Sequence, residues 1–159
     1  MKIREITPVD DKKLALIIRK NLEASKLDIP GTAYFDSNLD HLSEYYNDSC
    51  KTRAYYVILD DDGNLLGGVG MEKFENITNC VEMQKLYLSN EAKGKCLGIE
   101  LVSYLEEKAK EQGYSKVYLE THSNLKSAIY LYEKMGYNQI ERPDFVIHTT
   151  MDMFFIKDI

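Results

Sequence analysis

The sequence has little cysteine and no long apolar run. Its three cysteines are Cys50, Cys80 and Cys96, and their odd number and wide spacing indicate neither a disulfide framework nor a zinc site. No apolar stretch is long enough to span a bilayer, and residues 1–11, MKIREITPVDD, lack the apolar core of a signal peptide. We therefore expect a cytoplasmic protein with no membrane partner.

Metal-ligand patterns and a basic surface are also missing. The histidines His41, His122 and His148 do not have metal-ligand spacing, so we predict no metal site. Acidic residues outnumber lysine and arginine by 26 to 20, which gives a formal net charge of −6. This excess argues against non-specific binding of nucleic acid, and it is compatible with a cationic small substrate. We expect no nucleic-acid partner.

The chain shows no internal repeat and no low-complexity tract. Its 159 residues suit one domain with a single core. Its three prolines and nine glycines fall mainly between periodic segments and mark no linker. We therefore predict a single domain over residues 1–159.

The hydrophobic pattern predicts strands that alternate with helices. Strands are expected at 2–7, in a hairpin over 53–74 that turns at 60–64, at 80–88, at 116–121, and near 137–141 and 147–156. Helices are expected within 7–25, capped by Thr7 or Asp10, within 36–46, from the turn at 93–98 to about Gly113, and at 125–135. A strand, a crossover helix and a strand imply one parallel pair in an otherwise antiparallel sheet. The expected fold class is α/β (α+β), a mixed twisted sheet covered by helices.

The segment 91–99, EAKGKCLGI, places two glycines and two lysines before a long amphipathic helix. The first amides of a helix have no internal partner and lie at the positive end of its dipole, so they bind anions. Gly94 and Gly98 would let the backbone approach a phosphate, and Lys93 and Lys95 would add positive charge. We therefore expect unpaired amides over residues 93–99. Taken alone, the same residues also fit a tight turn with solvated lysines.

Two other phosphate-binding motifs fit this sequence less well. A P-loop requires G-x-x-x-x-G-K-[ST], whereas Gly94 and Gly98 are too close together and Ile99 follows them. The dinucleotide fingerprint G-x-G-x-x-G is absent after the first strand. The run GGVG at 67–70 lies inside an expected strand, where glycines mark a bulge or a close backbone approach.

The order of four segments resembles the GNAT family of acyl-CoA-dependent N-acyltransferases. The segments are the strand EMQKLYL, the turn KGKCLG, the strand VYLET and the helix AIYLYEKMGY. Lys93 and Gly98 stand at the ends of the family's [Q/R]-x-x-G-x-[G/A] phosphate signature, and Cys96 occupies its central glycine. The resemblance covers the whole order of elements and is sharpest over 80–137. It implies a GNAT-like fold with a sheet of about seven strands.

The resemblance also implies an activity and a catalytic pair. The activity is transfer of an acetyl group from acetyl-CoA to a primary amine of a small molecule or peptide, by direct attack in a ternary complex. Tyr132 matches the family tyrosine that protonates the departing thiolate, although its helical spacing also fits a core residue. Glu82 lies where some members place a general base, and a strand glutamate that faces solvent or pairs with a lysine is an equal alternative.

The remaining site residues follow from the family pattern. Those implied to bind the coenzyme are Leu86, Tyr87, Leu88, Lys93, Gly94, Lys95, Cys96, Leu97, Gly98, Ile99 and Asn124. Asn124 is included because the family motif N-x-x-A has Leu125 at its asparagine position here. Cys96, expected in the first helical turn, should narrow the phosphate site and weaken or shift coenzyme binding without abolishing it.

The acceptor side is the least defined part of the pattern. Tyr34, Asp36, His41 and His148 lie in the regions through which family acceptors enter. Family members often form dimers through their C-terminal strands, and TTMDMFFI at 149–156 is apolar enough to allow a homodimer. The departures at Cys96 and Leu125 keep a second hypothesis open, a catalytically silent acyl-CoA-binding regulatory module.

Overall fold

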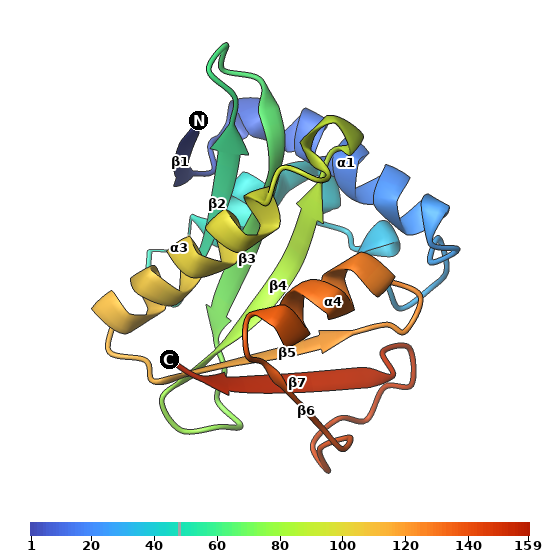
Figure 1. Cartoon of the computed structure of the whole chain (residues 1–159), viewed down its shortest axis with the longest axis vertical. Helices are drawn as coiled ribbons and strands as arrows, with labels where there is room; N and C mark the ends of the chain where they lie inside the picture. Colours follow the sequence, from blue (N-terminus) through green and yellow to red (C-terminus); the bar gives the residue numbers. More distant parts are fainter. Residues whose placement is uncertain (48) are drawn as a thin grey trace.

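The computed structural model describes residues 1–47 and 49–159, which form one seven-stranded sheet with helices on both faces (Figure 1). The strands are β1 (Lys2–Glu5), β2 (Arg53–Leu59), β3 (Leu65–Lys73), β4 (Cys80–Leu88), β5 (Lys116–Thr121), β6 (Asn138–Ile140) and β7 (Met153–Asp158). The α-helices are α1 (Asp11–Ala24), α2 (Leu42–Tyr46), α3 (Leu97–Glu111) and α4 (Lys126–Lys134). Short 3₁₀ turns are η1 (Pro8–Asp10), η2 (Ala33–Phe35), η3 (Leu39–His41) and η4 (Asn90–Ala92). The predicted fold class is confirmed.

The strand order across the sheet is β1-β2-β3-β4-β5-β7-β6. Among the described strands, β4 and β5 form the one parallel pair, because the crossover helix α3 connects them. Their ladder joins only Cys80–Glu82 to Lys116–Tyr118. Beyond these residues the two strands diverge (Figure 1), and this divergence positions the candidate site.

Strand β4 carries an extra residue opposite β3. Gly68 pairs with Tyr87 and Gly70 with Gln84, so two residues of β4 face Val69 alone. The backbone at Lys85 has a φ of +49°, which allows the extra residue to bulge out of the ladder. The bulge bends β4 just after it leaves β5.

Alternation along the strands divides the core between the two faces of the sheet. Tyr56 and Ile58 of β2 pack in the cluster that contains the apolar side of α3 and Tyr132 of α4. Tyr55 and Val57 point the other way and pack against α1 and α2. Helices α3 and α4 therefore belong to one face, and α1 and α2 to the other.

The main differences from the predicted elements lie at their ends. The first strand stops at Glu5 because Thr7 begins the turn η1, where its N–H donates to the Asp10 carboxylate at 2.8 Å. The last strand starts only at Met153, so residues 147–152 form a connection that is not part of the sheet.

The apolar side chains Phe154 and Phe155, within residues 149–156, pack inside the protein itself. Strand β7 lies between β5 and β6, and its Phe154 and Phe155 are buried. The edges of the sheet are β1 and β6 instead. A homodimer therefore stays a prediction, and it would need a surface other than these two side chains.

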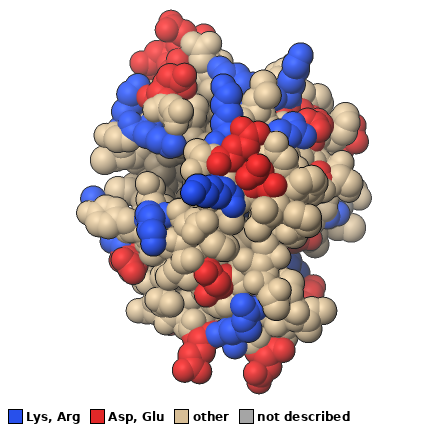
Figure 2. Space-filling view, turned by 90° about the vertical axis from the view of Figure 1, so that its right-hand side faces the viewer, with Lys and Arg blue, Asp and Glu red and all other residues tan. Residues whose placement is uncertain are grey.

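The described ranges contain no helix with both the length and the apolar character needed to cross a membrane. Their histidines, cysteines and carboxylates also form no group of three that could hold a metal ion. Basic and acidic side chains are interspersed on the face shown in Figure 2. The net charge of −6 is thus not gathered into one acidic patch on that face.

Candidate active site

A cavity of about 500 Å³ opens at the point where β4 and β5 diverge. Its walls come from α1 and the segment that follows it, β4, the turn before α3, β5, α4 and the β6–β7 connection. The lining residues are Asn21, Leu22, Ala24, Ser25, Leu27, Gly31, Thr32, Ala33, Asp36, Glu82, Met83, Gln84, Lys85, Leu86, Tyr87, Leu88, Lys93, Gly98, Glu120, Thr121, Asn124, Leu125, Lys126, Ser127, Ala128, Leu131, Tyr132, His148 and Met151. The cavity thus connects elements from both faces of the sheet.

The turn before α3 presents a row of main-chain N–H groups without partners. In the part of the chain that the structure describes, the N–H groups of residues 94–98 donate to no protein acceptor. Two neighbours differ, because Lys93 N–H donates to Asn90 O at 3.3 Å and Ile99 N–H to Cys96 O at 3.0 Å. The expectation of unpaired amides over 93–99 is therefore wrong at its two ends. The free amides lie between them, where an anion would find them unpaired.

Only part of this turn lines the cavity itself. Lys93 and Gly98 do so, whereas Gly94, Lys95 and Cys96 are exposed beside it. Leu97 is buried in the core. A Cβ at Gly98 would lie 2.9 Å from Cδ2 of Leu131 on α4. The absence of a side chain at Gly98 therefore lets the start of α3 pack closely against Leu131 of α4.

Cys96 lies outside α3, which corrects the expectation that it belongs to the first helical turn. It is the N-cap residue, and its φ of +60° and ψ of 12° are left-handed. An L-residue pays roughly 1–2 kcal/mol for this conformation, whereas glycine does not. The sequence predicts that the Cys96 side chain weakens or shifts coenzyme binding by narrowing the phosphate site. Backbone strain at the same residue is a second reason to expect a weaker site.

Replacing Cys96 by glycine is expected to stabilise the fold by about 0.5–1 kcal/mol, because relief of strain exceeds the added entropy of the unfolded chain. Thermal unfolding should therefore shift upward by roughly 1–4 °C. Cys96→Ala is the matched control, since it removes the sulfur and keeps the Cβ. If both variants unfold at the same temperature, strain at this position is not the cause.

Strand β4 brings Leu86, Tyr87 and Leu88 to the cavity, as the coenzyme-binding prediction requires. Not all of its carbonyl groups are available, however. The Leu88 carbonyl accepts from Asn21 Nδ2 of α1 at 2.9 Å, and the Lys85 carbonyl accepts from Tyr55 Oη at 2.8 Å. These bonds hold the bulged strand in place against α1 and β2.

Glu82 lines the cavity at the last position where β4 pairs with β5. Its carboxylate accepts from Gln84 Nε2 at 2.9 Å, and Gln84 in turn accepts from Tyr46 Oη at 2.7 Å. Burial raises the pKa of the Glu82 carboxyl, and the negative charges of Glu120 and Glu72 raise it further. A carboxylate with a raised pKa is a better proton acceptor near neutral pH.

Tyr132 reaches the same cavity from α4, on the opposite face of the sheet. Its side chain is 6% exposed, and its hydroxyl has no hydrogen-bond partner among the described residues. Burial raises the pKa of this phenol, and Tyr87 adds to the effect. The group is therefore a neutral donor with a free hydrogen.

The predicted acceptor residues separate in the structure. Asp36 and His148 line the cavity, whereas Tyr34 and His41 do not. Tyr34 instead donates from its hydroxyl to Glu23 at 2.8 Å on the surface. A Cβ on Gly31 would lie only 2.3 Å from Thr150 Oγ1, so the segment after α1 meets the β6–β7 connection beside the cavity.

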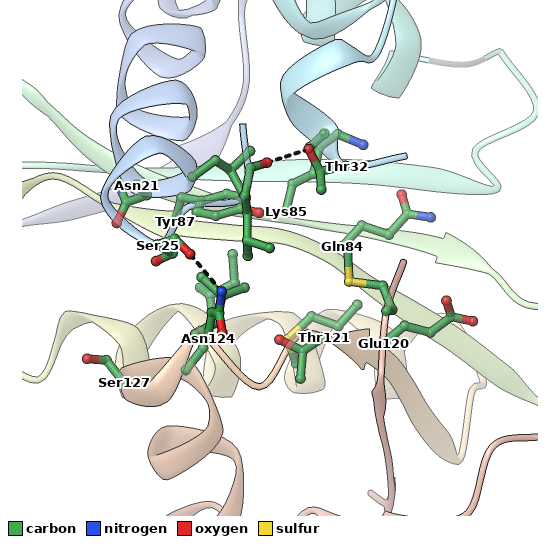
Figure 3. A pocket seen from close by; sticks show the side chains of 18 of the residues that line it. Asn21, Ser25, Thr32, Gln84, Lys85, Tyr87, Glu120, Thr121, Asn124 and Ser127 are labelled. Atoms are coloured by element: carbon green, nitrogen blue, oxygen red, sulfur yellow. Dashed lines mark hydrogen bonds between the residues drawn. The ribbon is translucent and has the colours of Figure 1, made fainter. Parts of the chain in front are cut away.

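Asn124 connects the two faces across the cavity. Its Nδ2 donates to the Ser25 carbonyl, at the end of α1, at 2.9 Å (Figure 3). Leu125, at the asparagine position of the family motif, is partly buried against the α1 cluster. Asn124, one position before Leu125, is therefore the residue whose side-chain amide contacts the end of α1.

Sequence reasoning missed several polar residues of the cavity, among them Glu120, Lys85 and Asn21. Glu120 follows Tyr118 by two positions on β5, so strand alternation could have placed it on the same face as Glu82. Lys85 reaches Asp36 at 2.9 Å from a bulge that no local motif indicates. Asn21 lies on a helix whose pattern predicts only packing, and its bond to Leu88 required the tertiary structure.

A cavity with unpaired amides beside it and a carboxyl and a phenol in its walls suits an enzyme active site. The family model that matches the chain is the Acetyltransferase (GNAT) family, over residues 23–137. YjgM of Escherichia coli K12, an uncharacterized N-acetyltransferase, is 34% identical over 145 residues, 87% of this chain and 83% of that protein.

Solved structures share the fold. A GNAT-family acetyltransferase from Staphylococcus aureus Mu50 has a TM-score of 0.83 at 19% identity, covering 99% of this chain and 98% of the other. The PaiA N-acetyltransferase from Thermoplasma acidophilum, solved in complex with coenzyme A, has a TM-score of 0.77 at 19% identity, covering 99% and 98%. The chain belongs to the GNAT acetyltransferase family, and its class is that of acyl-CoA-dependent acetyltransferases.

Proposed function

We propose that this chain, acting as one domain over residues 1–159, transfers an acetyl group from acetyl-CoA to a primary amine of a small molecule or peptide. The transfer is direct and takes place in a ternary complex. The observation that carries the proposal is the shared cavity, with unpaired amides beside one end and Glu82 and Tyr132 in its walls. The coenzyme A complex of PaiA supports the choice of donor.

The residues present fit such a donor. The free amides of residues 94–98 suit a diphosphate. Lys93 and Lys126 add positive charge in the cavity wall, and Gly98 lines the same cavity without a side chain. Acetyl-CoA supplies the activated acetyl thioester. The protein's part is to hold it and to move two protons.

The proton steps follow from the two titratable groups. The Glu82 carboxylate takes a proton from the acceptor nitrogen, which then forms a bond to the acetyl carbon. The carbon–sulfur bond breaks, and the Tyr132 hydroxyl gives its proton to the departing sulfur, while the second proton that the nitrogen loses as the amide forms returns to the Tyr132 oxygen. Because Glu82 lies toward the α2 side and Tyr132 on α4, acceptor and donor approach from different faces.

Replacing Gly98 by phenylalanine is expected to abolish coenzyme binding, because even a Cβ there would press on Leu131, so the ring must enter the cavity or displace the turn. In the wild type, acetyl-CoA at about a hundred times its Kd adds about 2.7 kcal/mol of stability, a shift of roughly 5–10 °C in thermal unfolding. The variant should show no shift.

Glu100→Phe is the matched control, because it adds the same ring two residues further along α3 at an exposed position. Unliganded melting curves report whether each variant folds. If the melting temperature of the wild type does not change when acetyl-CoA is added, the proposal is contradicted. Binding without acetylation of any amine in a panel would favour the silent acyl-CoA-binding module instead.

A further inference from the structure

The two ends of the cavity differ in charge. Lys93 and Lys126 lie on the coenzyme side, together with the unpaired amides. The other end contains Glu82 and Glu120, and Figure 3 shows Gln84 and Glu120 on the side away from Ser127. A cation is therefore favoured where the acceptor would enter.

The other charges at this end do not neutralise the two glutamates. Lys85 is committed to Asp36, with 2.9 Å between Nζ and Oδ2, so that pair cancels. Among the remaining described lining residues on this side, His148 is the one that can carry a positive charge. One imidazole therefore stands against two carboxylates, Glu82 and Glu120.

Glu120 is held as a fixed acceptor, whereas its partner His148 is not. The Oε1 atom of Glu120 accepts from Tyr118 Oη at 3.0 Å, and the Oε2 atom of Glu120 lies 2.7 Å from His148 Nε2. The Glu120 side chain is 15% exposed and that of His148 is 47% exposed. Arg142 holds the His148 carbonyl at 2.7 Å, so the imidazole can swing away while the connection keeps its place.

Resting on the proposed function, we propose that Glu120 binds a second cationic group of the acceptor, in the place that the His148 imidazole occupies until the acceptor arrives. The substrate class is a diamine, or another amine that carries a second ammonium group. One amine is acetylated beside Glu82 while the other is anchored on Glu120. The register supports this, because Tyr118 pairs with Glu82 and Glu120 follows two residues later on the same side of β5.

The test compares diamines with monoamines of equal length. The probes are 1,4-diaminobutane with n-butylamine and 1,5-diaminopentane with n-pentylamine, and the readout is the ratio of their kcat/KM values from release of the coenzyme thiol. The wild type should prefer a diamine by about tenfold or more, the worth of a charge-assisted contact. Glu120→Gln should remove this preference, and His148→Ala should increase it by removing the competing cation.

The diamine preference should fall in Glu120→Gln and rise in His148→Ala. Because these changes are opposite in direction, a merely structural role of Glu120 would not produce them. Taking the ratio of two acceptors also cancels any effect of Glu120 on the chemistry at Glu82. Glu133→Gln, an exposed carboxylate on α4 outside the cavity, should leave the ratio unchanged. A ratio that is unaffected by Glu120→Gln, or that falls in His148→Ala, would overturn the anchor.

Calorimetry separates this inference from the proposed function. Binding of 1,4-diaminobutane or 1,5-diaminopentane to the protein saturated with coenzyme A requires no turnover. Binding by the wild type but not by Glu120→Gln supports the anchor even if no amine is acetylated. Equal turnover of diamines and monoamines would support the proposed acetyltransferase activity and would overturn the role of Glu120 as an anchor. Absence of diamine binding would also overturn that role.

Discussion

Replacement of Tyr132 by phenylalanine is expected to lower kcat by about a hundredfold or more, the usual contribution of a general acid. The phenol has no hydrogen-bond partner among the described residues, and burial raises its pKa. It therefore remains protonated up to at least about pH 10, its ordinary range. Pre-steady-state and steady-state acetylation of an accepted amine would measure the loss, and the KM for acetyl-CoA should change little.

The fold should tolerate this substitution. Tyr132 packs against Tyr137 and Phe155 through its ring, which phenylalanine keeps, and the hydroxyl that is lost satisfies no protein group. Tyr130→Phe is the matched control, because Tyr130 lies on the same helix and is 67% exposed. If Tyr132→Phe retains most of the wild-type kcat, the proton reaches the departing sulfur by another route.

The sequence was sufficient to predict the part of the site that depends on chain order. Strands at 80–88 and 116–121 were predicted with the bounds that β4 and β5 have, because short apolar runs bounded by turn residues are a local signal. The crossover helix between them then required a parallel pair. Glu82 and Tyr132 reach one cavity as a consequence of that order.

Properties set by a single backbone angle were not predictable. Cys96 looks compatible with a helix by residue type, and its left-handed φ appears only once α3 is seen to begin at Leu97. The bulge at Lys85 is similar, since it depends on register with β3 rather than on local sequence. Lys85 lines the cavity, and Cys96 lies exposed beside it.

The acceptor side was least predictable because its contacts are long-range. His148 and Glu120 are distant in the sequence and meet through the β6–β7 connection, for which no periodic pattern exists. His41 and Tyr34 had the right residue types and nearby positions, yet the segment after α1 directs them away from the cavity. Residue type alone therefore could not separate His148 from His41.

Replacement of Glu82 by glutamine is expected to lower kcat by about a hundredfold or more at neutral pH, because the isosteric amide accepts no proton. The wild-type enzyme needs the ionised carboxylate. Since burial raises the pKa of that group, kcat at saturating substrates should fall as the pH drops through this raised pKa. A pH profile of kcat measures the acid limb directly, and the limb should be absent in Glu82→Gln.

A second variant shows whether the acid limb of the pH profile of kcat reports the titration of Glu82. The charge of Glu72 contributes to the raised pKa, and Glu72 lies within 3.3 Å of Gln84 Nε2, the donor to Glu82. Glu72→Gln removes that charge, so the pKa of Glu82 should fall and the acid limb should move to lower pH while turnover persists. An acid limb that stays at the same pH in Glu72→Gln, and survives in Glu82→Gln, would assign the base to another group. Glu72 lies outside the cavity, so we expect its effect on the limb to reach the reaction through Glu82 and Gln84.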